Sequence, residues 1–256
     1  MELNRDFAIK VRDLIDQGLV SGVGVQEPGK MCIEAVVCYA LGMPHGDQPT
    51  CVELISVQPF KTALNDCGWT SPKVRAAGMR RLGIAQLGSN TIDPSVFCAE
   101  LQRLTIQRIV PIALRVAASV HPDATHKEKL EHWAVRCEAG PSVENASAAS
   151  AAARAAASYA SYAARAAASD ARAARAAASY ASAASYAASY AASYASYAAS
   201  AAARAAASYA SYAARAAASD HVLTIAAECG VDALRVAGSP GCQWLDVCDE
   251  NKRSDP

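Results

Sequence analysis

The chain has 256 residues and a formal net charge of +0, so its composition does not favour general electrostatic capture of nucleic acid or of an anionic membrane. Its hydrophobic content is 52%, but much of this is alanine between residues 147 and 220, which buries little apolar area per residue. The large aliphatic side chains lie in residues 1–141 and 221–248 and must supply the ordinary core. No segment approaches 18 strongly apolar residues, so a transmembrane span is not expected.

The nine cysteines would indicate a disulfide framework in a small secreted domain, but this chain is of medium size. Its first residues, MELNRDFAIKVRD, lack the apolar core of a signal peptide. We therefore expect a cytoplasmic protein whose cysteines are reduced and mostly buried thiols.

The first 140 residues predict a series of helices with legible start and stop signals. Gly18, Gly42 and Gly88 each follow a helical pattern and end it, whereas Ser71 and Asp93 each precede a proline and begin one. The expected helices cover residues 4–17, 31–41, 59–65, 73–87 and 95–120, with Pro111 dividing the last, and a further helix after Pro122 that carries Trp133 and ends near Gly140. No sustained alternation of the kind that predicts a strand is present, so the fold class expected is all-α.

An alanine-rich repeat follows, and it contains no glycine or proline from Ser142 to Cys229. Alanine has the highest helix propensity, so the segment is expected to be helical. The block AAARAAASYASYAARAAASD occurs without change at residues 151–170 and 201–220, which marks an internal duplication. Whether the repeat is one long helix or folds back as hairpins, with breaks at the Ser-Asp pairs, is left open by the sequence.

Serine or arginine recurs every three or four residues along the repeat, which places one polar row down a helix. Nine tyrosines each follow a serine and form a second row about 100° away. They are Tyr159, Tyr162, Tyr180, Tyr186, Tyr190, Tyr194, Tyr197, Tyr209 and Tyr212. The rest of the circumference is methyl groups, so a lone helix would expose an apolar surface larger than monomers tolerate. The tyrosines are therefore the expected interaction residues.

The composition suggests three segments: an N-terminal helical domain at residues 1–141, the repeat at 142–220, and a C-terminal helix and tail at 221–256. In the last segment an apolar stripe that the alanine repeat cannot cover is formed by Val222, Ile225, Ala226 and Cys229. We expect this segment to pack on the N-terminal domain.

Residues 29–52, GKMCIEAVVCYALGMPHGDQPTCV, are the first place to search for chemistry. Cys32 follows a glycine-rich loop at a helix start, where the helix dipole stabilises a thiolate. His45 and Asp47 in the adjacent loop are the first candidates to assist it as a base, and the other histidines considered are His121, His126 and His132. The alternative interpretation is that Cys32 is an ordinary buried cysteine, because no cysteine-hydrolase signature is present.

Metal and cofactor sites have no support in the sequence. The pair Cys32 and Cys38, and likewise Cys242 and Cys248, has a spacing that turns the two side chains to different helix faces, and no CxxC or HExxH is present. No dinucleotide fingerprint or Walker loop occurs. We predict no metal and no cofactor.

Four segments resemble a group of uncharacterised bacterial and phage proteins. They are KMCIEAVVCYALGMPHGDQPTCV, LNDCGWTSPKVRAAGMRRLGIAQLGS and RIVPIALRVAAS before the repeat, and SPGCQWLDVCD after it. The group carries a variable alanine-rich tract at the position of the repeat. The resemblance implies a shared α-helical frame and a prokaryotic cytoplasmic or phage context, and it implies no activity and no functional residue.

The sequence thus favours a non-enzymatic structural or interaction protein, whose alanine and tyrosine surface packs against another helix. The expected partner is a second copy of the chain or another helical protein, with no nucleic acid and no membrane. Two alternatives remain: a cysteine-dependent hydrolase or transferase using Cys32, and an ice-binding or other surface-binding helix. The second resembles the helical antifreeze proteins of fish, but residues 147–220 contain no threonine.

Overall fold

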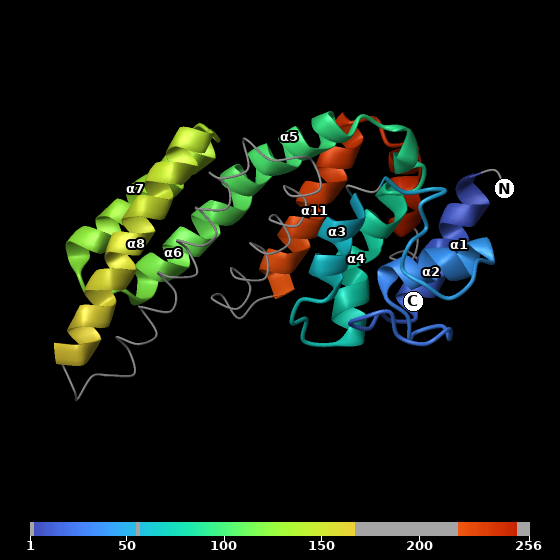
Figure 1. Ribbon diagram of the computed structural model, residues 1–256, viewed down its shortest axis with the longest axis horizontal. Coiled ribbons are helices and arrows are strands. Elements are labelled where there is room, and N and C mark those ends of the chain that lie inside the picture. The colour runs from blue at the N-terminus through green and yellow to red at the C-terminus, as the bar shows by residue number, and fades with distance from the viewer. Residues whose placement is uncertain (1–2, 55–56, 167–219, 250–256) are drawn as a thin grey trace. The chain divides into compact units, whose positions relative to one another are not determined.

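The computed structural model describes residues 3–54, 57–166 and 220–249 of the chain (Figure 1). Over these residues the fold is all-α, as predicted, with nine α-helices, one isolated β-bridge between Gly24 and Met31, and no strand. The chain divides into two compact units, Met1–Leu101 together with Leu223–Pro256, and Gln102–Val222. Two helices that precede residue 141 pack with the helix that contains the start of the repeat.

The first unit is built from helices whose ends follow the local signals in the sequence. They are α1 (Arg5–Asp16), α2 (Ile33–Leu41), α3 (Val57–Asn65), α4 (Pro72–Ala85), most of α5 (Pro94–Leu104) and α11 (Asp220–Val236), with the 3-10 segments η1 (Ser89–Thr91) and η4 (Pro240–Cys248). Asn4, Cys32 and Ser71 each cap a helix by accepting a hydrogen bond from a backbone N–H in its first turn. Gly42 ends α2 with a left-handed φ of 71°, a conformation that favours glycine.

The C-terminal helix and tail pack on helices of the N-terminal segment. Gly230 of α11 lies against Phe60 and Leu82, where a methyl group would clash with the Phe60 ring. Gly241 of η4 lies directly against the backbone carbonyls of Ile84 and Ala85, an approach that only glycine allows. Both glycines let the last part of the chain come closer to α3 and α4 than any larger residue would.

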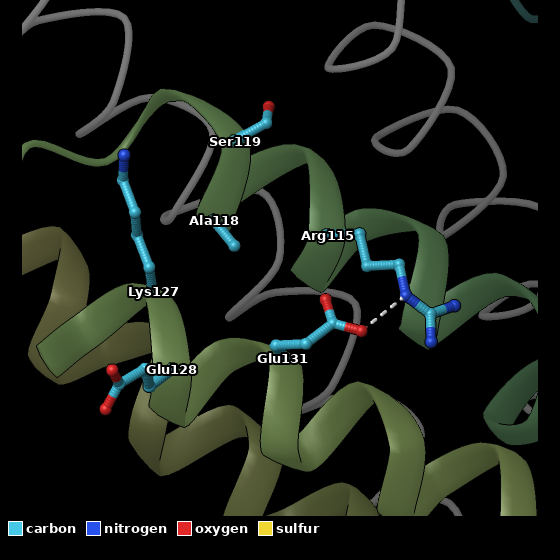
Figure 2. Close-up of a pocket in the computed structure, with 6 residues that line it drawn as sticks. All are labelled: Arg115, Ala118, Ser119, Lys127, Glu128 and Glu131. Atoms are coloured by element: carbon cyan, nitrogen blue, oxygen red, sulfur yellow. Dashed lines mark hydrogen bonds and ion pairs between the residues drawn. The ribbon is translucent and has the colours of Figure 1, made fainter. Parts of the chain in front are cut away.

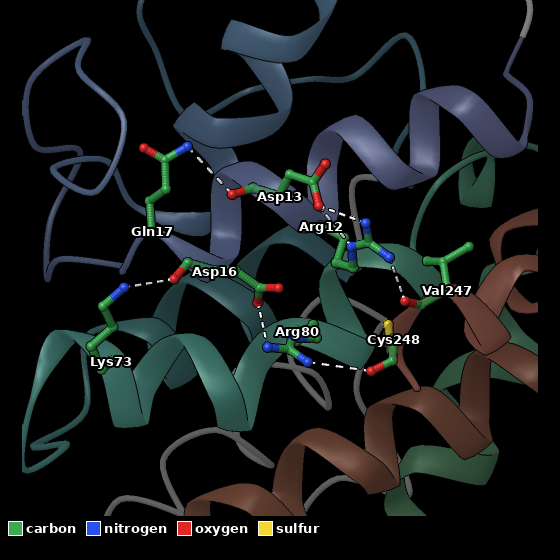
Figure 3. A network of polar contacts seen from close by, with 8 residues as sticks. All are labelled: Arg12, Asp13, Asp16, Gln17, Lys73, Arg80, Val247 and Cys248. Atoms are coloured by element: carbon green, nitrogen blue, oxygen red, sulfur yellow. Dashed lines mark hydrogen bonds and ion pairs between the residues drawn. The ribbon is translucent and has the colours of Figure 1, made fainter. Parts of the chain in front are cut away.

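Polar contacts fasten η4 to α1 and α4 (Figure 3). Arg12, which is 7% exposed, donates to the Val247 carbonyl at 2.8 Å. Arg80 donates to the Cys248 carbonyl at 3.3 Å and forms an ion pair with Asp16 at 2.6 Å. These hydrogen bonds satisfy two carbonyls of an irregular segment and link η4 to α1 and α4.

The second unit contains the π-helical turn η2 (Thr105–Ile109), α6 (Val110–Val120), α7 (Ala124–Ala139) and α8 (Val143–Ala166), and the three α-helices lie side by side (Figure 1). The π turn ends just before Pro111, which lies in the first turn of α6. Proline cannot donate a backbone hydrogen bond, so the division expected at Pro111 is taken up by this wider turn. The α8 helix covers the start of the repeat, and the remainder of the repeat lies outside the described residues.

Across the described ranges, no helix combines the length and the apolar character that a bilayer crossing requires.

Candidate functional site

The described part of the repeat forms an interface in which α8 packs on α7. One face of α8 is buried, and its members are Ala146, Ala149, Ser150, Ala153 and Ala156, each no more than 1% exposed. The facing helix contributes Leu130, Ala134 and Cys137, all fully buried. The buried positions of α8 recur at three and four residues, which is the spacing of one helix face. Small side chains on that face allow the two helix axes to approach closely.

The polar row predicted for the repeat is solvated only in part. Ser147, Arg154 and Ser158 are exposed, as a solvated row requires, but Ser150 is buried. Its hydroxyl oxygen accepts a hydrogen bond from Arg154 Nη2 at 2.8 Å, so the buried serine is satisfied by the next member of the row. The exposed face of this helix is therefore narrower than the sequence pattern suggested.

A cluster of aromatic rings lies at the end of the α7–α8 interface where α7 begins. The Tyr159 ring lies 4.8 Å from the His126 ring and 5.7 Å from the His121 ring, measured between centroids. His121 Nδ1 accepts from the Asp123 backbone N–H at 3.1 Å, which leaves Nε2 as the donor to the Ala156 carbonyl at 3.0 Å. The histidine therefore links the α6–α7 corner to the backbone of α8.

Tyr159 is the member of the predicted tyrosine row whose side chain the structure describes, and it is 41% exposed. The side chains of the other eight, from Tyr162 to Tyr212, lie outside the described residues. The interaction role assigned to that row stays a prediction.

An open groove of about 480 Å³ runs between α6 and α7 (Figure 2). Its lining consists of Arg115, Ala118 and Ser119 from α6 and of Lys127, Glu128 and Glu131 from α7. Arg115 crosses the groove and pairs with Glu131 at 2.9 Å and with Glu138. Its hydrogen bonds hold the pKa of the Glu138 carboxyl below the ordinary value. Because the ion pairs of Arg115 join α6 to α7 across the groove, we interpret the groove as part of a stabilised contact between these two helices.

The Cys32 thiol is a capping group in this structure. Its Sγ accepts the Ala35 backbone N–H at 3.3 Å, and the residue is 4% exposed. Burial raises the pKa of the thiol to about 11, against the smaller opposing effect of that hydrogen bond. A thiolate nucleophile needs the opposite shift, so the environment of Cys32 does not favour the hydrolase interpretation.

His45 and Asp47 lie in the loop after α2 but do not form a catalytic arrangement with Cys32. His45 Nε2 interacts with the Gly24 carbonyl at 3.1 Å, and its ring is exposed. Among the contacts of the described residues, none joins a histidine to the Cys32 thiol. Asp47 does share a cavity with Cys32.

This cavity has a volume of about 160 Å³ and lies beside the N-terminus of α2. Its lining consists of Gly22, Val23, Cys32, Ile33, Glu34, Asp47, Thr62, Asn65 and Asp66. Asp66 Oδ1 accepts the Gly22 backbone N–H at 2.7 Å, and Asn65 donates to the Val20 carbonyl at 2.8 Å. The last turn of α3 therefore holds the loop before α2 in place and forms one wall of the cavity.

A buried charge cluster lies behind the cavity wall, and the sequence analysis missed it. Lys61 Nζ lies 2.8 Å from Glu34 and 2.9 Å from Glu53, and all three side chains are at most 2% exposed. Burial, together with the neighbouring Glu53, raises the pKa of Glu34 well above its ordinary value despite the opposing effect of Lys61. The pKa of Lys61 is raised, because its attraction to the two carboxyls exceeds the effect of burial. One signal for this cluster was available in the sequence, because Glu34 is an acidic residue inside the apolar run Ile33–Leu41 and a buried carboxyl needs a partner.

The structure places no group of three or more histidine, cysteine or acidic side chains at metal-binding distance anywhere in its described ranges. All nine cysteines are free thiols, and seven of them are buried, in agreement with the prediction for reduced and mostly buried cysteines. Comparison with protein-family models, with curated proteins and with solved structures finds no match for this chain.

Proposed function

We propose that this chain is a non-enzymatic interaction protein, whose alanine and tyrosine helix makes close contacts with other helices, including those of a second copy. The observation that carries the proposal is the buried row of small residues from Ala146 to Ala156, seated against α7. The described start of the repeat therefore packs on α7 along one face, and the small residues of that face are almost unexposed.

The same surface is encoded again fifty residues later. The buried positions of α8 correspond to Ser196, Ala199, Ser200, Ala203 and Ala206, all of them small. The exposed positions Glu144 and Ser147 correspond to Tyr194 and Tyr197, so tyrosine replaces polar residues where a second contact has to form. The pattern of small side chains that α8 buries within the chain is therefore present again in residues 196–206, where it can serve a second helix contact.

Tyrosine should supply most of the energy of that contact. A fully buried alanine methyl contributes on the order of 0.8 kcal/mol, whereas an aromatic side chain buries a far larger area and keeps its hydroxyl hydrated. In the described part, Tyr159 already combines ring stacking with an exposed fraction of 41%. Residues of this kind suit a helix contact that remains at the surface.

The test compares two variants of the full chain by size-exclusion chromatography with light scattering and by thermal melting. In the first, Tyr186, Tyr190, Tyr194 and Tyr197 are replaced by serine. In the second, the six arginines of the repeat are replaced by glutamine. We expect the tyrosine variant to lose association or compactness far more than the arginine variant.

A monomeric wild type whose size and melting temperature do not respond to the tyrosine changes would contradict the proposal. In that case the repeat would act as a spacer or as a surface-binding helix, and an ice-recrystallisation assay would separate these two. The hydrolase alternative is not proposed, because the Cys32 thiol is buried and its pKa is raised.

A further inference from the structure

Three sulfur-bearing side chains gather where α2 ends, and two of them are brought together by the way the helix stops. Gly42 turns the chain in the left-handed region, and the backbone N–H of Met43 then donates to the Cys38 carbonyl at 2.9 Å. In this helix-ending motif the two residues joined by that hydrogen bond commonly have their side chains in contact. Cys38 is buried and Met43 is half-buried, so a thiol and a thioether meet at this end of the helix.

The third sulfur comes from the loop that follows. The Cys51 thiol is exposed and donates to Met43 Sδ at 3.8 Å. The same loop also reaches Cys38. Burial raises the pKa of the Cys38 thiol, a hydrogen bond from the Gln48 backbone N–H lowers it, and the nearby Cys51 thiol adds a smaller increase. Cys38 and Cys51 therefore lie close enough to interact, and Met43 contacts the second of them directly.

The loop that carries Cys51 is held in place on both sides of the bend. Asn90 donates to the Cys51 carbonyl at 3.0 Å, and Gln58 donates to the Asp47 carbonyl at 2.5 Å. Ligands that are fixed before binding lose little conformational freedom when the ion arrives. The sulfur cluster, defined as Cys38, Met43 and Cys51, is thus gathered in advance and is open to solvent through the exposed Cys51.

We propose that the sulfur cluster binds one copper(I) ion through the thiolates of Cys38 and Cys51 and the thioether of Met43. Two thiol protons leave for solvent as the ion enters, and no electron is transferred. With the zinc–sulfur bond length of about 2.3 Å as a scale, two sulfurs on one ion lie about 3.8–4.0 Å apart at tetrahedral or trigonal angles. Cys51 Sγ and Met43 Sδ already have this separation, so one ion can bridge them with little movement of the loop.

The donor set selects copper(I) rather than zinc. Zinc in proteins takes its ligands from cysteine, histidine and carboxylate groups, and no three such side chains lie at metal-binding distance within the described residues. His45, in the same loop, contacts the Gly24 carbonyl instead. A thioether is a soft ligand and, like a thiolate, favours copper(I). The cysteine and histidine spacings that exclude zinc therefore do not exclude a softer ion.

The probe is copper(I), supplied without oxygen to the reduced full chain from a coloured copper(I) chelator that competes for the ion. We expect the chain to withdraw one tightly bound equivalent. X-ray absorption at the copper edge should show three sulfur ligands and no nitrogen or oxygen ligand. Zinc(II), offered from a zinc-sensitive chelator of comparable affinity, should stay with its chelator. Absence of a tight copper equivalent, or a copper ion with fewer than three sulfur ligands, would overturn the proposal.

Variants separate the sulfur cluster from a simple adduct of one reactive thiol. Met43→Leu keeps the side-chain volume and removes the sulfur. Because residues behind metal ligands already cost about 10–100-fold in affinity when mutated, loss of this ligand should weaken binding by at least about tenfold. Cys51→Ser and Cys38→Ala should weaken it further.

Cys242→Ser is the matched control, since it removes a half-buried thiol elsewhere in the same unit and should leave the affinity for copper(I) unchanged. An unchanged affinity in Met43→Leu would show that copper binds as an adduct of a single thiol, and would overturn the proposal. Loss of the tight equivalent in Cys242→Ser would do the same. If Cys38→Ala does not fold, Met43→Leu and the sulfur count decide.

Discussion

At the scale of single residues, we expect the largest losses of folding stability from substitutions in the cluster of Glu34, Glu53 and Lys61. Removal of one member of a buried ion pair leaves the others uncompensated, which is far more costly than the net contribution of the pair itself. Substitutions that preserve the charge balance of the cluster should therefore cost little stability, whereas substitutions that remove this balance should cost much more.

Lys61→Met should lower the free energy of unfolding by about 3–5 kcal/mol, because two buried carboxyls then lose the cation that pairs with both. Glu34→Gln keeps the shape and the neutral state of a protonated carboxyl, so its cost should be about 1 kcal/mol or less. Urea unfolding of both variants, followed by the tryptophans of the first unit, measures the difference. Equal losses would show that charge balance is not what the cluster provides.

The raised pKa of Glu34 also predicts how stability depends on pH. As pH rises above 4.5, the ordinary value for glutamate, the unfolded chain loses the Glu34 proton while the folded protein retains it. The folded state then binds more protons, so the Glu34 contribution to stability falls by about 1.4 kcal/mol per pH unit until the folded pKa is reached. Glu34→Gln lacks this loss. Its stability relative to wild type should increase from pH 4.5 upward in urea titrations, and parallel curves would contradict the prediction.

The cysteines should differ sharply in reactivity. Cys51 is exposed, whereas Cys32 is buried with a pKa of about 11. Labelling with a thiol reagent at pH 8, followed by peptide mass spectrometry, should modify Cys51 first and Cys32 only on unfolding. The Cys51→Ser variant should lose the fast phase. Rapid labelling of Cys32 in the folded protein would reopen the nucleophile interpretation.

At the scale of elements, the contact between α7 and α8 depends on side-chain size more than on hydrophobicity. Ala153 is fully buried against α7, while Ala155, two residues away, is exposed on the same helix. Both positions have the same helix propensity, so the pair separates packing from propensity.

Ala153→Leu should destabilise the second unit by about 1–3 kcal/mol, because the added atoms force the helices apart. Ala155→Leu should change stability by about 0.5 kcal/mol or less. Hydrogen exchange of the backbone amides in α7 reports on this unit alone. A matching effect of the two variants would mean that the buried row is not a packing surface.

At the scale of the whole molecule, polar side-chain contacts reinforce the core packing that joins α1 to η4. Arg12 reaches the Val247 carbonyl from α1, and Arg5 forms an exposed ion pair with Asp246 nearby. The two arginines thus offer a buried and an exposed contact to the same segment.

Arg12→Met should cost about 1.5–3 kcal/mol, the range for a buried hydrogen bond from a charged group, and should speed hydrogen exchange across residues 245–248. Arg5→Met should cost about 1 kcal/mol or less, as exposed ion pairs generally do. Exchange rates that remain unchanged in Arg12→Met would show that other contacts hold the tail.

The sequence alone determined the fold class and the positions of most described helices. Capping residues such as Asn4 and Ser71, and helix ends such as Gly42, act on neighbouring backbone groups, so their effect is readable locally. Pro111 likewise marked the division before α6, although the π turn that absorbs it was not predicted.

Only the tertiary structure decided which polar residues are buried and with what partners. Ser150 belongs to a polar row by sequence, yet the approach of α7 buries it. Glu34, Glu53 and Lys61 are separated by up to 27 positions, and nothing local indicates that they meet. Burial and charge pairing depend on neighbours that folding brings from distant parts of the chain, whereas caps and turns depend on the adjacent few residues.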